Sequence, residues 1–294
     1  PYTTLFRSRA LVPGFPAFMS NVIDKELVAE LGSKFGAADV RLYLAKTPDS
    51  SITLYVIDAP DLFDRLGNPY ADANNQAYAD NYRRFALLGW VAAQLAGSLD
   101  PEWSAEVVHG HDWHAGLAPA YLKAEEIKTG QKLAASIFTV HNLAYQGVFP
   151  YRVLAEIDLP IWFFNIHGLE FHGQVSFLKA GLFFADKIIT VSPSYAREIQ
   201  GEEQGCGLHG LLQARSHDLS GVLNGVDPAI WSPVTDSLIA ANYNTRSVAG
   251  KLACRSALQE YCGLAQQDEK PIFAIVSRLT EDRKSTRLNS SHGY

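Results

Sequence analysis

The feature of this sequence that most constrains its fold is the alternation of short apolar runs with helical patterns. Runs such as SIFTV (136–140) and KIITVS (187–192) are apolar almost throughout, which is typical of strands covered on both faces of a parallel sheet. We expect strands at 52–57, 107–111, 135–140, 187–191, 221–223 and 271–276. The alternation therefore predicts an α/β fold built on a doubly wound sheet.

The intervals between these runs carry helical patterns. Residues 80–96 place apolar side chains such as Leu88 and Leu95 on one stripe, as expected for a helix that packs against a sheet. Ser192 followed by Pro193 indicates a helix start, with an N-cap and a proline at the first helical position. Helices are expected at 80–96, 176–185, 193–199 and 245–262. In such folds ligands bind outside the carboxyl ends of the strands, so polar residues there are the first site candidates.

Composition and charge narrow the classes of function. Of the 294 residues, 47% are hydrophobic and 19% are charged, as in a soluble globular protein with a sizeable core. The net charge of -6 without a Lys/Arg run disfavours a nucleic-acid partner. The longest apolar stretch, 85–96, contains Gln94 and is too short to span a bilayer, so no membrane partner is expected. Three cysteines without a CxxC pair argue against a disulfide framework and favour the cytoplasm.

The two ends of the chain depart from this pattern. The chain begins at Pro1 rather than methionine, and residues 1–8 show no clear period. Residues 284–294, KSTRLNSSHGY, are polar and unpatterned after an apolar run. We expect both segments to be non-native tails of the kind that cloning leaves behind, and the chain between them to be a fragment.

The densest group of candidate ligands is VVHGHDWHAGLAPAYL (107–122), where three histidines and an aspartate fall within six residues. A dinuclear metallohydrolase would show HxHxDH at a strand end. Here Asp112 comes one residue earlier and Trp113 takes its place, although strand alternation puts His109 and His111 on one face. No downstream His or Cys shows ligand spacing, so no metal is expected. Two interpretations of Asp112 stay open, a ligand contact and a cap of the following helix.

Two further segments invite a functional interpretation. The strand at 135–140 is followed by His141, whose ring suits hydrogen bonds to a hydroxyl-rich ligand, although single histidines are often structural. A GxGxxG at 205–210 would need a strand just before it to bind a nucleotide. A helix and the acidic GEEQ precede it instead, so we expect a flexible loop there.

Turn signals supply the last two candidates. Asn224-Gly225 follows the apolar run 221–223, and Tyr70 ends the string GNPY. Turn chemistry of this kind says nothing about function by itself. The residues alone therefore predict an α/β protein with ligand loops at 67–70, 109–114, 139–147 and 221–227.

Taken together, these loops resemble bacterial glycogen synthases and the related starch synthases. The resemblance rests on strings that occur in family order: RFALLGW (84–90), HGHDWHAGLAPAYL (109–122), FTVHNLAYQGVF (138–149), the segment 164–199, GVLNGVD with IWSP (221–233), and VSRLT (276–280). It implies a GT-B architecture of two Rossmann-like domains. An incomplete N-terminal domain would cover 9–225, and the start of the second would cover 226–283.

The resemblance also implies a reaction, the transfer of glucose from ADP-glucose to the non-reducing end of an α-1,4-glucan with retention of configuration. Neither a metal nor another cofactor is implied. His141 would contact the donor glucose near the reacting centre, and Asp112 would shape the sugar and acceptor side. Tyr70 and Asn224 would line the donor site, and Arg278 would bind the diphosphate. The histidines beside Asp112 would then serve in packing or support.

Two departures from the family pattern bear on activity. The family's KTGGL loop, which cradles the donor phosphates, is absent, and the lysine expected after VSRLT falls in the tail, where Arg283 and Lys284 are unconvincing substitutes. We therefore expect this chain alone to lack synthase activity. Three alternatives stay open: a retaining transferase that uses UDP-glucose, a metallohydrolase built on HGHDWH, and a non-catalytic glucan-binding module.

Overall fold

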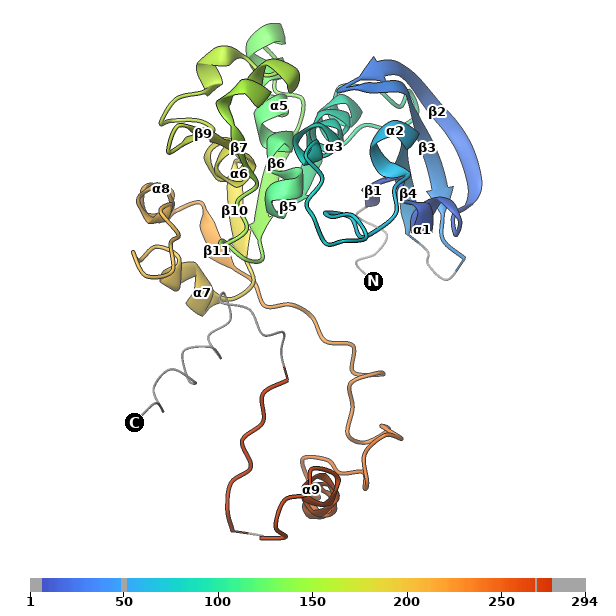
Figure 1. The fold of residues 1–294 in the computed structure, drawn as a ribbon, viewed down its shortest axis with the longest axis vertical. Helices are drawn as coiled ribbons and strands as arrows, with labels where there is room; N and C mark the ends of the chain where they lie inside the picture. Colours follow the sequence, from blue (N-terminus) through green and yellow to red (C-terminus); the bar gives the residue numbers. More distant parts are fainter. Residues whose placement is uncertain (1–6, 49–51, 268, 277–294) are drawn as a thin grey trace. The chain divides into compact units, whose positions relative to one another are not determined.

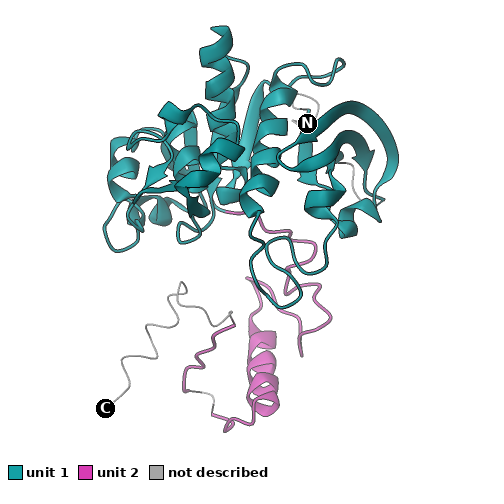
Figure 2. Cartoon of the chain, turned by 45° about the horizontal axis from the view of Figure 1, so that its top comes forward, with its two compact units in different colours: residues 1–223 teal, residues 224–294 magenta. Residues whose placement is uncertain are grey.

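The computed structural model describes residues 7–48, 52–267 and 269–276. Contacts divide the chain into two units, unit 1 over Pro1–Leu223 and unit 2 over Asn224–Tyr294 (Figure 2). Each unit is described by itself. The assignment of catalytic domains to 9–225 and 226–283 stays a prediction, because compactness alone assigns no role to a unit.

Unit 1 contains a parallel sheet of four strands, three of which lie at expected apolar runs (Figure 1). Its order is β11-β10-β6-β5, and every neighbouring pair is parallel. The strands are β5 (Val107–His111), β6 (Ala135–Val140), β10 (Lys187–Thr190) and β11 (Leu219–Gly221). The last differs from the predicted 221–223, because the register with β10 runs from Leu219 to Gly221, and Val222 and Leu223 are exposed beyond it.

Helices cover this sheet and are held to it by apolar contacts. The helix α5 packs against β5 and β6 and also against α3 and α6. These are α3 (Asn81–Ala96), α5 (Leu117–Thr129) and α6 (Phe177–Phe184). Buried Phe138, on β6, lies against Gly181 of α6, where an added Cβ would stand 2.5 Å from the ring. The close helix–sheet contact therefore depends on a glycine at this point.

A second, mixed sheet precedes the parallel one in the chain. Its order is β1-β4-β3-β2, with β1 parallel to β4 and the other pairs antiparallel. The strands are β1 (Arg9–Pro13), β2 (Ile23–Lys34), β3 (Ala37–Lys46) and β4 (Thr53–Asp58), and the short helices α1 (Pro16–Met19) and α2 (Pro60–Phe63) accompany them. Only the last of these strands was expected from the sequence.

The missed strands β2 and β3 form a hairpin. Most of β2 is exposed, so its sequence lacks the apolar run that marks a buried strand. The turn is Phe35-Gly36, and both residues have positive φ (48° and 87°), as a two-residue hairpin turn requires. Val40 and Leu42, both fully buried, alternate with polar residues and were the signal available in the sequence.

A small sheet, ordered β7-β9-β8, follows β6 and supports the loop that begins at His141. Its strands are β7 (Val148–Pro150), β8 (Glu170–Phe171) and β9 (Gln174–Ser176), with the 3-10 helices η1 (Tyr151–Glu156) and η2 (Ile161–Phe163) between them. The backbone N–H of Phe177 donates to Gly147 O at 3.1 Å, and that of Leu178 to Gln146 O at 3.1 Å. These bonds tie the loop to the start of α6.

The predicted cap at Ser192 is confirmed, because its hydroxyl accepts the N–H of Tyr195 at 2.9 Å at the start of α7 (Pro193–Glu198). Helix α7 separates the GxGxxG at 205–210 from strand β10, so the strand–turn–helix context of a nucleotide-binding turn is missing. The expected loop is wrong at its end, since His209 and Gly210 already belong to α8 (His209–Ala214). Gly205 lies so close to His209 that an added Cβ would stand 2.5 Å from the histidine Cβ.

Unit 2 has helix α9 (Ala249–Tyr261), inside the predicted 245–262. The strand expected at 271–276 is not formed, and Phe273 is 91% exposed. A strand needs a neighbour for its backbone hydrogen bonds, and the described residues of unit 2 include no other strand. Arg278 and the predicted tail 284–294 lie outside the described residues. Throughout the described ranges no helix is long and apolar enough to cross a membrane.

Candidate functional site

Two neighbouring parallel strands bring the site residues together. Strand β5 ends at His111 and strand β6 at Val140, so the residues that follow them, Asp112 and His141, share one edge of the sheet. The backbone N–H of His141 donates to the Asp112 carboxylate at 2.8 Å. Asp112 makes no capping bond in its own short helix α4 (Asp112–Ala115). Its carboxylate orients the neighbouring loop, so the capping interpretation is wrong.

The backbone of Asp112 is itself unusual. Its φ of 53° is left-handed, a conformation that costs most residues about 1–2 kcal/mol and that aspartate and asparagine tolerate best. The charge-assisted bond to His141 offsets part of that cost. The turn points Trp113, the next residue, across the loop, where its ring lies against Gly147.

The histidines of the strand end form a hydrogen-bonded row. The rings of His109 and His111 stack with centroids 4.3 Å apart, which confirms that both lie on one face. His111 Nδ1 lies 3.0 Å from His141 Nε2, and His109 Nε2 lies 2.7 Å from Thr139 Oγ1. Each of these contacts engages one of the two nitrogens of a histidine ring. Among the described residues no group of three or more His, Cys, Asp or Glu side chains is placed to hold a metal ion.

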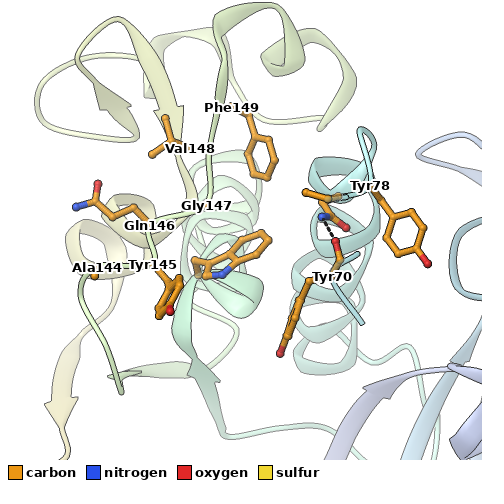
Figure 3. Close-up of a pocket in the computed structure, with 11 residues that line it drawn as sticks. Tyr70, Tyr78, Ala144, Tyr145, Gln146, Gly147, Val148 and Phe149 are labelled. Carbon is orange, nitrogen blue, oxygen red and sulfur yellow. Dashed lines mark hydrogen bonds between the residues drawn. The ribbon is translucent and has the colours of Figure 1, made fainter. Parts of the chain in front are cut away.

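Tyr70 reaches the same region from the loop before α3. Its ring lies 4.7 Å from that of His114, and burial together with the negative charge of Asp112 raises the pKa of its hydroxyl. A cavity of about 510 Å³ opens beside it (Figure 3). Aromatic side chains dominate its lining and amides supply polar groups: Tyr70, Tyr78, Trp113, Tyr145, Phe149, Asn81 and Gln146.

Figure 3 shows how two segments face each other across this cavity. Tyr70 and Tyr78 lie on one side, and the residues from Ala144 to Phe149 lie on the other. Aromatic faces of this kind are typical of a site for a sugar chain, because C–H-rich ring faces stack on them. The site is thus a concave surface beside the Asp112–His141 pair.

Comparison with known proteins gives this site a family. The model of the starch synthase catalytic domain matches residues 6–214, most of the chain. This chain belongs to the starch synthase catalytic domain family. The resemblance seen in the sequence is thereby confirmed, and with it the α/β, Rossmann-like fold of a GT-B enzyme.

Relatives of this starch synthase domain include the glycogen synthases of Francisella tularensis subsp. novicida and Francisella philomiragia. Each is 61% identical over 277 residues, which is 94% of this chain and 57% of the relative. A solved structure, the catalytic domain of Starch Synthase IV from Arabidopsis thaliana bound to ADP and acarbose, matches with a TM-score of 0.67 and 25% identity. That match covers 89% of this chain and 53% of the other. The chain therefore spans a little over half the length of these relatives.

The structure brings together three of the five site residues predicted for this starch synthase domain. Tyr70, Asp112 and His141 meet in unit 1, as described above. Asn224 is exposed and is the first residue of unit 2, and Arg278 lies outside the described residues. The roles of all five in donor or acceptor binding stay predictions.

Sequence reasoning gave no site role to four aromatic residues of the cavity. Trp113 was treated only as the residue that breaks a metal motif, and no role was assigned to Tyr78, Tyr145 or Phe149. The available signal was the string AYQGVF, in which a glycine stands between two aromatics. Gly147 has a φ of 57° and lets Trp113 approach so closely that an added Cβ would stand 2.3 Å from the ring.

His114 predicts a pH dependence of stability. Its ring is packed against Tyr70, Phe85 and Trp113, and burial lowers its pKa to about 4 although Asp112 acts in the opposite sense. Unfolding returns the pKa to about 6.5, so below that pH the unfolded chain binds a proton that the folded chain does not. Neutral His114 thus stabilises the fold fully above about pH 6.5, and this contribution, on the order of 3 kcal/mol, is lost as the pH falls toward 4.

The measurement is the free energy of unfolding in urea at about pH 7.5 and pH 5. We expect a His114→Phe variant to lose less stability between these two pH values than the wild type, with the exposed His217→Phe as the control. Equal losses in wild type and His114→Phe would contradict the assignment to His114.

Proposed function

We propose that this chain contributes the N-terminal half of the site of a glycogen synthase that transfers glucose from ADP-glucose to the non-reducing end of an α-1,4-glucan with retention. The observation that carries the proposal is the 61% identity over 277 residues with Francisella glycogen synthases. In the reaction a bond forms between the donor's anomeric carbon and an acceptor hydroxyl oxygen. The bond from that carbon to the diphosphate breaks, ADP leaves, and the hydroxyl proton is released to the departing diphosphate.

The geometry of unit 1 supports separate places for the acceptor and the donor in this reaction. The aromatic cavity suits the glucan acceptor, whose ring faces would stack on Trp113, Tyr145 and Tyr70. This proposal places Tyr70 on the acceptor side, whereas the family resemblance implied the donor side. His141 is exposed beside it at the sheet edge, where its ring would bond a hydroxyl of the donor glucose. Asp112 would hold His141 through the backbone bond. The diphosphate needs cationic groups and N–H donors, a role proposed for Arg278, with Asn224 on the donor side.

Binding and transfer test the proposal separately. Titration calorimetry of this chain with maltoheptaose should show binding that Trp113→Ala removes. A chimera that adds the parts of the Francisella relative outside the aligned region should incorporate radiolabelled glucose from ADP-glucose into glycogen, and more slowly from UDP-glucose. Transfer from UDP-glucose alone would favour the alternative donor. Glucan binding by a folded chimera that transfers from neither donor would favour a binding module.

We also propose that the protein acts in the cytoplasm, without a nucleic-acid or membrane partner. Support comes from its acidic charge and from Cys206, Cys254 and Cys262, which are all unpaired thiols. A reducing compartment keeps such thiols unpaired.

A further inference from the structure

A buried guanidinium lies beneath the segment that carries Tyr70. Arg84, on helix α3, is 1% exposed, and none of the described carboxylates forms an ion pair with it. The nearby Asp80 is engaged by Arg65 at 2.6 Å. Burial lowers the pKa of Arg84 to about 10, so the side chain is still charged at neutral pH. A buried charge without a directly paired counter-ion is costly, and its retention calls for a structural or functional reason.

The bonds of Arg84 lead to residues 64–80, which we call the Tyr70 loop. Its Nη1 donates to the carbonyl of Pro69 at 2.9 Å and to the Asn81 side-chain oxygen at 2.7 Å. The Asn81 amide then donates to the carbonyl of Tyr70 at 2.9 Å. A further bond from Nε reaches Leu62 O at 2.8 Å, at the end of α2. Arg84 thus binds the segment before the loop at Leu62. Within the loop it binds Pro69 directly and Tyr70 through Asn81, and these two residues form the tip of the loop.

The other hydrogen bonds at that tip come from within the loop itself. The backbone N–H groups of Tyr70 and Ala71 both donate to the Asn68 side-chain oxygen, at 2.8 Å and 2.9 Å. Tyr70 is 47% exposed, and the remaining backbone bond to its carbonyl comes from Tyr78, within the same loop, at 3.2 Å. The Tyr70 ring contacts Phe85 and His114 at centroid distances of 6.2 Å and 4.7 Å. Its orientation toward the cavity therefore depends on where its backbone is held.

This set of hydrogen bonds requires an arginine side chain. A guanidinium presents N–H groups in a fixed planar fork, so one side chain reaches Leu62 O from Nε and Pro69 O from Nη1. Its flat face also lies over aromatic rings, 4.6 Å from the centroid of Tyr78. A lysine ammonium is a compact point charge and would not serve oxygens of separate segments in this geometry.

We propose that Arg84 and Asn81 are positioning residues that hold Tyr70 in the orientation in which it contacts the glucan. The inference rests on the proposed function of the cavity. Neither residue needs to touch the sugar for this role. Their effect passes through Tyr70, and this dependence separates the proposal from a general loss of stability.

The test is a double-mutant cycle on the purified 294-residue chain with maltoheptaose as the probe. Arg84→Lys and Asn81→Ala are each expected to raise the dissociation constant roughly tenfold. In a Tyr70→Ala background the same substitutions should change it by less than about twofold, because the residue through which they act is gone. Hydrogen exchange of residues 64–80 should be faster in both single variants.

Arg215→Lys is the matched control. Arg215 is a partly buried arginine that also donates to backbone carbonyls, those of Leu182, Phe183 and Asp186, and it pairs with Asp218 at 2.9 Å. None of these residues lines the cavity. The substitution should lower the free energy of unfolding without changing the affinity for maltoheptaose or the hydrogen exchange of the Tyr70 loop.

Several results would overturn the proposal. Full additivity with Tyr70→Ala would mean that Arg84 and Asn81 act independently of Tyr70. Unchanged affinity for maltoheptaose in both single variants would show that neither residue positions Tyr70 for glucan binding. If Arg84→Lys does not fold, Asn81→Ala decides alone. Failure of the wild-type chain to bind maltoheptaose would count against the proposed function. Hydrogen exchange of residues 64–80 would then test whether Arg84 and Asn81 hold the Tyr70 loop. Unchanged exchange in both single variants would overturn that role as well.

Discussion

Replacing Gly147 with alanine is expected to lower the free energy of unfolding of unit 1 by about 3 kcal/mol and to remove glucan binding in the cavity. Two costs combine at this residue. Its φ of 57° disfavours any side chain, and the new Cβ would stand 2.3 Å from Cε3 of Trp113. The indole has little room to retreat, since Phe85 packs edge-on against it at 4.9 Å. Either the loop or the indole must move, and both line the cavity.

Gly130→Ala separates the two costs. Gly130 has a similar φ of 72°, but an added Cβ there meets no atom within 4 Å. This control should lose only about 1 kcal/mol, because it carries the backbone cost without the collision. Urea unfolding followed by tryptophan fluorescence gives both values, and calorimetry with maltoheptaose gives the affinity. Equal losses in the two variants would show that contact with Trp113 is not what makes Gly147 necessary.

Asp112→Ala is expected to slow glucose transfer by the full-length chimera about 100-fold, the size of effect that a small misplacement of a site residue produces. The substitution removes the acceptor for the His141 N–H, so the start of the loop that carries His141 loses its hydrogen bond to α4. It also places alanine at a φ of 53°. The initial rate of incorporation of radiolabelled glucose into glycogen measures the effect.

Asp112→Asn distinguishes positioning from charge. Asparagine tolerates the left-handed backbone and still offers an oxygen to the His141 N–H, so we expect a smaller loss, about tenfold. Asp158→Ala is the control, since Asp158 also has positive φ (55°) but pairs with Lys34 and does not line the cavity. If asparagine were as damaging as alanine, the negative charge itself would be the functional property.

The sequence predicted the parallel sheet well because its strands are local patterns. Buried runs such as 135–140 must be apolar on both faces, and that requirement is visible in one segment at a time. The hairpin of β2 and β3 was missed because β2 faces solvent, and the strand at 271–276 failed because an apolar run does not supply its own neighbour. Strand ends alone marked Asp112 and His141 as candidates, but the roles of all five proposed site residues came from the family resemblance. Turn chemistry alone would have left Tyr70 and Asn224 without a role.

The sequence by itself determined the family of this chain, its α/β class and the strand ends at which Asp112 and His141 stand, since these follow from order and local pattern. Only the tertiary structure decided what those residues do to one another. The register of β5 and β6 places the Asp112 carboxylate on the His141 N–H, and the cavity joins Tyr70 to Tyr145 from loops far apart in the chain. Such contacts depend on distances that close only when the sheet has formed, and no residue pattern within a single segment specifies them.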